Sequence, residues 1–263
     1  MHLPSVVRQL LAIRPYHDRL RAMTGADEAP IPWQRLRYGP HARQYLLHAT
    51  PPHARDAPLA VYLHGGGWQF GSPELLQEFG AYFYRRGYRV AMLSYRRLFR
   101  FHGEDIYADA VAALRASFGE SPPPTLLLAG VSAGGTLAAL LALRQNRWRD
   151  AAPDTEVGGL VACCAPLSLA DMALTPTRER FAGRPHGRRW RELDPLEHLT
   201  HRPDFPAVVV HGERDALVPV ACSRAFVARG RALGWAGLDY HELPGGGHLS
   251  AAAWVFGGGA RLP

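Results

Sequence analysis

The chain contains 263 residues, of which 47% are hydrophobic and 20% are charged, and its formal net charge is +7. The length fits one large α/β domain, and the composition provides enough apolar residues for a buried core and argues against a disordered chain. All 30 basic side chains are arginines, scattered along the sequence without a basic helix or an RNA-binding signature, so we expect no nucleic-acid partner.

Three cysteines, Cys163, Cys164 and Cys222, occur without the spacing of a zinc site or of a disulfide framework. Such cysteines are typical of a reducing compartment, which predicts a cytoplasmic protein. The first apolar residues of the chain are interrupted by Arg8 and Gln9, unlike a signal peptide, and no apolar run is long enough to span a bilayer. We therefore expect no membrane association, while the sequence leaves the oligomeric state open.

In chain order, residues 1–32 are expected to form an N-terminal helix and loop, because residues 5–22 carry apolar side chains at helical spacing. Residues 33–38 and 43–49 then predict a pair of edge strands. From there short apolar runs alternate with amphipathic segments. They predict strands at 59–63, 88–93, 125–129, 159–164, 207–211 and 237–243, and helices at 73–86, 104–117, 133–145, 220–233 and 249–256.

This alternation predicts an α/β fold with a mostly parallel central sheet and helices on both faces. No repeat or second unit interrupts the pattern, so residues 1–263 are expected to form a single domain. In such sheets ligands bind outside the carboxyl ends of the strands, and the loops there should carry the chemistry. The segment 166–206 is too long for an ordinary connection, and we predict that it forms a small lid-like insertion over these strand ends.

The pentapeptide Gly130–Gly134 has the pattern G-x-S-x-G between a predicted strand and a predicted helix. Such a turn is sharp and strained, so small residues are needed at both glycine positions, and it projects the hydroxyl of Ser132 clear of the sheet. The backbone N–H of Ala133 at the helix start can then stabilise an oxyanion. A glycine-rich turn with a helix-capping serine is the alternative, which the strand–turn–helix context disfavours.

A second glycine-rich loop, beginning at His64, follows the strand 59–63 and resembles the oxyanion loop of many lipases and esterases. We expect the backbone N–H groups of Gly66 and Gly67 to be the donors, with Gly65 as an alternative. His64 is expected to hold the loop rather than to act as a base. A phosphate-binding loop is disfavoured because neither a Walker A nor a dinucleotide pattern follows.

The acid and the general base should come last in the chain, each after a late strand. Asp215 follows the strand 207–211, with Glu213 as a lesser candidate, and His248 follows the strand 237–243 in a glycine-rich run. In isolation Asp215 could be a turn residue and His248 a solvated loop histidine. The required order of all the motifs favours a triad of Ser132, His248 and Asp215, a chemistry that needs neither a metal nor an organic cofactor.

These motifs resemble the α/β-hydrolase superfamily, and within it the hormone-sensitive-lipase-like carboxylesterases and the bacterial esterases close to kynurenine formamidase. The resemblance also includes Ser94-Tyr95-Arg96, Phe205-Pro206-Ala207 and Gly212-Glu213-Arg214-Asp215 with Val218-Pro219. It implies that Ser132, Asp215 and His248 are the catalytic residues. Val131 stands at a position where relatives usually carry Asp or His. Gly67 stands where formamidases tend to have a bulky residue, and this difference favours ester substrates.

Three hypotheses follow. The first is a serine hydrolase that cleaves carboxylic esters of small or short-chain acyl groups, the second is an aryl formamidase, and the third is a non-catalytic binding protein on a hydrolase fold. An arginine-rich stretch at 178–191 has two interpretations as well. It is either a solvated lid surface or a docking face for an anionic substrate or an acidic carrier protein.

Overall fold

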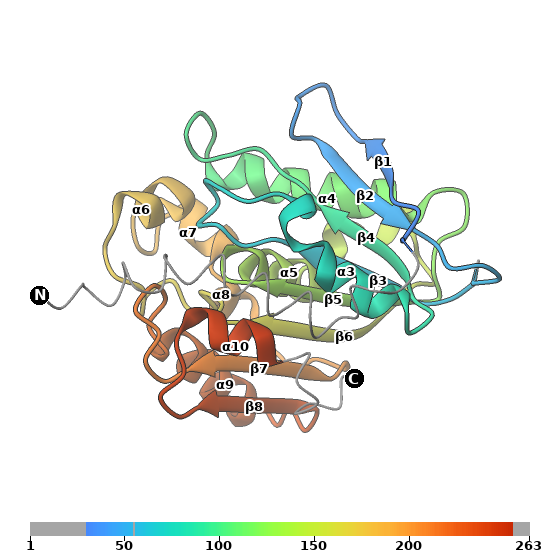
Figure 1. Ribbon diagram of the computed structural model, residues 1–263. Coiled ribbons are helices and arrows are strands. Elements are labelled where there is room, and N and C mark those ends of the chain that lie inside the picture. The colour runs from blue at the N-terminus through green and yellow to red at the C-terminus, as the bar shows by residue number, and fades with distance from the viewer. Residues whose placement is uncertain (1–29, 55, 255–263) are drawn as a thin grey trace, which may run out of the picture.

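The computed structural model describes residues 30–54 and 56–254, which form an eight-stranded sheet with helices packed against it (Figure 1). The strand order is β1-β2-β4-β3-β5-β6-β7-β8. Strand β2 runs antiparallel to β1 and β4, and the pairs from β4 to β8 are all parallel. The strands are β1 Gln34–Arg37, β2 Tyr45–Ala49, β3 Leu59–Leu63, β4 Arg89–Leu93, β5 Thr125–Val131, β6 Glu156–Cys163, β7 Ala207–Gly212 and β8 Leu238–Leu243.

Helices cover both faces of the sheet, because the side chains of its central strands are apolar on both faces and each face must be shielded from water. One core contains side chains of α3 and α10, and the other contains side chains of α4, α5, α9 and the segment between β6 and β7. The helices are α3 Gln77–Tyr84, α4 Gly103–Phe118, α5 Ala133–Leu143, α6 Pro176–Ala182, α7 Arg188–Leu193, α8 Pro195–His198, α9 Ala221–Ala232 and α10 His248–Trp254, with 3-10 turns η1 Pro73–Leu76, η2 Gln145–Arg147 and η3 Arg149–Ala151.

The predicted α/β class, the mostly parallel sheet and the helices on both faces are confirmed by this architecture. One expectation needs correction. The segment at 43–49 is not an edge strand, because β2 lies between β1 and β4 and pairs with both. The helix predicted at 5–22 lies outside the described residues. None of the helices within the described part of the chain is long and apolar enough to cross a membrane.

The segment 166–206 contains the three short helices α6, α7 and α8, which lie beside α4 and α5 at the carboxyl ends of the parallel strands (Figure 1). Its first helix is attached to the loop after β3. The Phe181 ring stacks on Trp68 with 3.9 Å between ring centroids, and the Nε2 of Gln69 donates to the hydroxyl of Thr177 over 2.6 Å. The insertion is therefore built into the apolar core, since Phe181 is fully buried.

Arginines of the stretch 178–191 make contacts both within the insertion and with α4. Arg178 is buried, donates to the carbonyl of Met172 and lies over the Trp190 ring. Arg188 and Arg189 pair with Glu104 on α4 at 3.2 and 2.9 Å. The stretch thus contributes intramolecular contacts along much of its length.

Candidate active site

The turn between β5 and α5 holds Ser132 in a backbone conformation that non-glycine residues rarely adopt, with φ 55° and ψ −127°. The glycines on either side permit this turn. A Cβ atom on Gly130 would lie 2.5 Å from the backbone of Gly134, and one on Gly134 would lie 2.0 Å from the carbonyl oxygen of Leu63. The sequence expectation that only small residues fit at these two positions therefore has a steric basis.

The loop after β3 lies directly against this turn. A Cβ atom on Gly65 would lie 3.2 Å from the Cβ of Ser132 and 3.1 Å from the carbonyl of Val131. Gly66 and Gly67 have φ of 118° and 59°, and the carbonyl of Gly66 accepts from the backbone N–H groups of Gln69 and Phe70. Within the described residues, no backbone hydrogen bond uses the N–H groups of Gly66 and Gly67. Ala133 begins α5, where the first N–H groups have no partner inside the helix.

His64 holds the shape of this loop. Its ring is buried, stacks on Tyr95 and has its Nδ1 2.8 Å from the carbonyl of Gly65, to which it donates. The hydroxyl of Tyr95 donates to the carbonyl of His64 over 2.6 Å. Burial lowers the pKa of His64 to about 4, so the ring is neutral near pH 7. These contacts agree with the structural role expected for this histidine.

The carboxylate of Asp215 and the imidazole of His248 are in direct contact, with 2.6 Å between Oδ2 and Nδ1. Both side chains are almost completely buried. The other carboxylate oxygen of Asp215 accepts from the backbone N–H groups of Leu217 and Val218 at 2.8 and 2.9 Å. The structure thus fixes the carboxylate in one orientation and leaves the Nε2 of His248 on the side of the ring away from Asp215.

Burial by itself would raise the pKa of Asp215. The hydrogen bonds from His211 and His248 and from the backbone outweigh that effect and hold the pKa of this carboxyl well below its usual range. Asp215 is therefore an anion at any pH near neutrality. A buried anion next to Nδ1 stabilises an imidazolium, which is what a general base becomes after it takes a proton.

The end of β6 brings the serine turn and the histidine loop together. The backbone N–H of Ser132 donates to the carbonyl of Cys163 over 2.8 Å. The thiol of the next residue, Cys164, donates to the backbone carbonyl of His248 over 2.9 Å. Ser132 and His248 are therefore both attached to the same dipeptide at the end of β6. Ser132 reaches it from the neighbouring strand β5, and His248 from the loop after β8, which β7 separates from β6.

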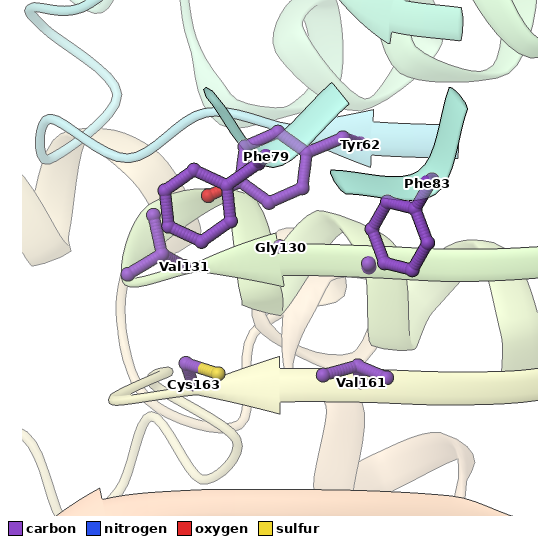
Figure 2. A pocket seen from close by; sticks show the side chains of 8 residues that line it. Tyr62, Phe79, Phe83, Gly130, Val131, Val161 and Cys163 are labelled. Carbon is purple, nitrogen blue, oxygen red and sulfur yellow. The ribbon is translucent and has the colours of Figure 1, made fainter. Parts of the chain in front are cut away.

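A cavity of about 10 Å³ lies beneath the serine turn, between α3 and the ends of β5 and β6 (Figure 2). Its wall includes Val131, Tyr62, Phe79 and Cys163. The space is at the lower limit for one water molecule, and most of its wall is apolar. Val131 therefore fits an apolar environment, in which the Asp or His of relatives would need a polar partner.

Among the described residues, one group combines three side chains that could ligate a metal. Its members are Cys164, Asp215 and His248, whose ligand atoms lie within 4.8 Å of one another. Two of these three are already committed to the carboxylate–imidazole hydrogen bond. The arrangement therefore suits proton transfer at His248.

Sequence reasoning did not single out two residues that contact this site. Cys164 carries no motif that would indicate its contact with the His248 loop. His211 precedes Asp215 by four residues, and its Nε2 lies 3.3 Å from the Oδ2 of Asp215. That spacing at the end of a buried strand was a usable signal, because a side chain there can reach back to the loop that follows. Glu213, the lesser acid candidate, is exposed and accepts from the N–H of Gly245 instead.

Comparisons with known proteins find two esterases among the curated relatives. Esterase LipC of Mycobacterium tuberculosis is 28% identical over 280 residues, which cover 87% of this chain and 68% of LipC. Esterase LipQ of the same organism is 29% identical over 237 residues, covering 80% of this chain and 55% of LipQ. This chain thus spans about two thirds of the length of one relative and about half of the other.

Among solved structures, Thermogutta terrifontis esterase 2, phosphoramylated by tabun, superposes with a TM-score of 0.67 at 23% identity. The superposition covers 84% of this chain and 86% of that protein, and it shows a shared fold. The BD-FAE family model matches residues 47–229, which include the serine turn, the glycine-rich loop and Asp215. Because this match covers well over half of the chain, the protein belongs to the BD-FAE family, a hormone-sensitive-lipase-like family of α/β-hydrolase esterases.

Proposed function

We propose that this protein hydrolyses carboxylic esters of small or short-chain acyl groups, with Ser132 as nucleophile, His248 as general base and Asp215 as the acid that orients His248. The observation that carries the proposal is the 2.6 Å hydrogen bond between Asp215 and His248, with His248 and the strained turn at Ser132 both bonded to the Cys163–Cys164 dipeptide. Membership in a family of esterases supports the reaction type. LipC and LipQ, both esterases by name, support it further.

In the proposed reaction, the hydroxyl oxygen of Ser132 attacks the acyl carbonyl while the Nε2 of His248 takes the hydroxyl proton. His248 then gives that proton to the departing alcohol, which leaves an acyl group on Ser132. Water enters and attacks the acyl-enzyme with the same proton transfers in reverse, releasing the acid. Asp215 remains ionised throughout, because its pKa is held far below neutrality.

The tetrahedral intermediates of both steps carry a negative oxygen. We propose that the backbone N–H groups of Gly66, Gly67 and Ala133 bind this oxygen, each stabilising it by about 3 kcal/mol in comparable sites. The support is that the N–H groups of Gly66 and Gly67 are uncommitted in the described structure and that their loop touches the serine turn. No step of this cycle requires a metal or an organic cofactor.

Several finer features are proposals of their own. The insertion 166–206 is proposed to act as a lid that limits acyl-chain length, because it lies at the carboxyl ends of the strands. A cytoplasmic location is supported by the three cysteines, all of which are buried thiols. An anionic substrate or acidic carrier at 178–191 has weaker support, because Arg188 and Arg189 already pair with Glu104.

Parallel assays on nitrophenyl esters of increasing chain length and on N-formylkynurenine test the proposal. We expect hydrolysis to be fastest with acetate or butyrate, to fall with longer chains, and to be lost by at least 10³-fold in Ser132→Ala. Stronger activity on the formamide than on the esters would contradict the ester proposal and indicate an aryl formamidase. Equal rates for the wild type and Ser132→Ala would contradict both enzyme hypotheses and favour the hypothesis of a non-catalytic binding protein.

A further inference from the structure

A second histidine, His211, lies on the far side of the Asp215 carboxylate from solvent. It belongs to β7 and is fully buried. Its Nε2 lies 3.0 Å from the carbonyl oxygen of Val218 and 3.3 Å from the Oδ2 of Asp215. Its Nδ1 lies 2.7 Å from the hydroxyl of Ser223, a buried residue in the first turn of α9.

The protonation of this ring follows from its partners. A backbone carbonyl can only accept a hydrogen bond, so the Nε2 of His211 must carry a hydrogen. This hydrogen is shared between the carbonyl of Val218 and the Oδ2 of Asp215. In the neutral ring Nδ1 is then an acceptor, which receives the hydroxyl hydrogen of Ser223. The contacts form a directed chain from Ser223 through His211 to Asp215.

The same contacts form a closed frame around the catalytic acid. Val218 donates its backbone N–H to the Oδ1 of Asp215 and accepts from His211 through its carbonyl. Oδ2 is left between His211 and His248. Rotation of the carboxylate away from His248 would break the contacts at both oxygens in a site from which water is excluded, where unpaired polar groups are costly.

We infer that His211 is a positioning residue for the proposed triad, held in its tautomer by Ser223, and that it shares the negative charge of Asp215 with His248. This inference rests on the proposed function. His211 does not touch substrate, and its effect reaches the reaction through Asp215. Its N–H disperses part of the carboxylate charge, so the imidazolium of His248 is stabilised less than it would be by an unshared carboxylate.

The other charged groups near His211 are already paired. Glu242 on β8 stands opposite His211 in the strand register and accepts from Arg224 at 2.9 Å. Cys222, next to Ser223 on α9, is a buried thiol whose pKa is raised to about 12 by burial and by nearby carboxylates, so it is uncharged near neutrality. The carboxylates of Asp171 and Asp194, from the segment before β7, also act on Cys222. Asp215 is in direct contact with His211, and His248 lies beyond it.

The test compares His211→Leu, His211→Gln and Ser223→Ala with the wild type on nitrophenyl acetate over a range of pH. Leucine removes the N–H at similar volume, whereas the glutamine amide can return an N–H to Asp215. For His211→Leu we expect kcat to fall about tenfold with KM within twofold, and the acid limb of kcat/KM to move up by about half a pH unit. His211→Gln should recover most of both effects.

Ser223→Ala should cause the same changes in kcat and pH profile, but smaller ones. It removes the hydroxyl that fixes the tautomer of His211 while the imidazole ring stays in place. It keeps the inference testable if His211→Leu does not fold. The matched control is His198→Gln, a half-buried histidine that bonds the carbonyl of Glu192 and contacts no triad residue. This control should leave the pH profile unchanged.

Two results would overturn the inference. One is a folded His211→Leu or Ser223→Ala with the kcat and acid limb of the wild type. The other is a loss in His211→Leu that His211→Gln does not reduce. Ser132→Ala in the same assay distinguishes failure of this inference from failure of the proposed function. If the wild type is active and Ser132→Ala is not, while the His211 variants are unaltered, this inference fails and the proposed function stands.

Discussion

At the scale of single residues, the site depends most on the close packing around Ser132, which leaves no room for additional side chains. Three chain segments meet there with backbone against backbone, and glycines occupy the contact points. Gly134 touches the end of β3, and Gly65 touches the serine itself. A side chain at either point would push the glycine-rich loop after β3 away from Ser132.

Substitution at Gly134 tests this. We expect Gly134→Ala to lower the free energy of unfolding by about 3 kcal/mol or more and to abolish ester hydrolysis, because its Cβ would lie 2.0 Å from the carbonyl of Leu63. Urea unfolding and nitrophenyl acetate assays measure the two effects. The control is Gly234→Ala, where φ is also positive but nothing lies within 4 Å, and about 1 kcal/mol should be lost. Equal costs at both positions would contradict the steric account.

At this scale the sequence predicted much of the site. The motifs located Ser132, Asp215 and His248, of which the structure brings Asp215 and His248 into contact and attaches Ser132 and His248 to the same dipeptide. Their catalytic roles stay predictions. The sequence could not locate Cys164 or Ser223, because their contacts depend on how β6 and α9 pack against loops far away in the chain.

At the scale of elements, the insertion between β6 and β7 is attached to the glycine-rich loop after β3 by an aromatic stack. Phe181 of α6 lies parallel to Trp68, with 12° between the ring planes. The arginines on the outside of the same insertion are much more exposed, and the side chain of Arg188 is 80% accessible. Burial therefore places the main anchor of the insertion at Phe181.

Two substitutions separate these contributions. We expect Phe181→Ala to lower the free energy of unfolding by about 3–5 kcal/mol and to reduce kcat, because Trp68 belongs to the loop proposed to bind the oxyanion. Arg188→Ala should change stability by less than about 0.5 kcal/mol, as exposed ion pairs do. Denaturant titrations with kinetics on the same samples measure both. A larger loss from Arg188→Ala than from Phe181→Ala would show that charge pairing holds the insertion.

A buried carboxyl also belongs to the insertion. Asp194 caps α8 by accepting from the N–H of Leu196, and it accepts from Leu169 as well. Burial raises the pKa of Asp194 to about 6. The folded protein therefore holds this proton more tightly than the unfolded chain does. The contribution of this protonated carboxyl to the free energy of unfolding is fully present below about pH 4 and is lost as the pH rises through about 6.

We expect the free energy of unfolding of the wild type to fall by about 2 kcal/mol from this group between pH 4.5 and 6.5. In Asp194→Asn this part of the decline should disappear, whatever the substitution costs at a single pH. Asp215 has no influence in this range, because its pKa is lowered and its contribution is lost only under stronger acid. Parallel pH slopes for wild type and variant, from urea unfolding, would contradict the assignment.

The whole molecule was predictable in its order of strands and helices, because parallel strands buried on both faces leave clear apolar runs such as 59–63 and 125–129. The place of β2 inside the sheet was not predictable. Its sequence at 45–49 has no feature that distinguishes pairing with one neighbour from pairing with two, and tertiary contacts with β4 decide this. The shape of 166–206 was also beyond prediction, since its helices are short and depend on burial against α4 and α5.

The central claim for the whole molecule is that distant loops form one relay that activates Ser132. Its most direct measurement is the rate and site of labelling by a fluorophosphonate, read by peptide mass spectrometry for the wild type, Ser132→Ala and His248→Gln. We expect a single adduct on Ser132, none in Ser132→Ala, and labelling slowed by at least about 10³-fold in folded His248→Gln. An adduct on another residue, or an undiminished rate without His248, would contradict the relay.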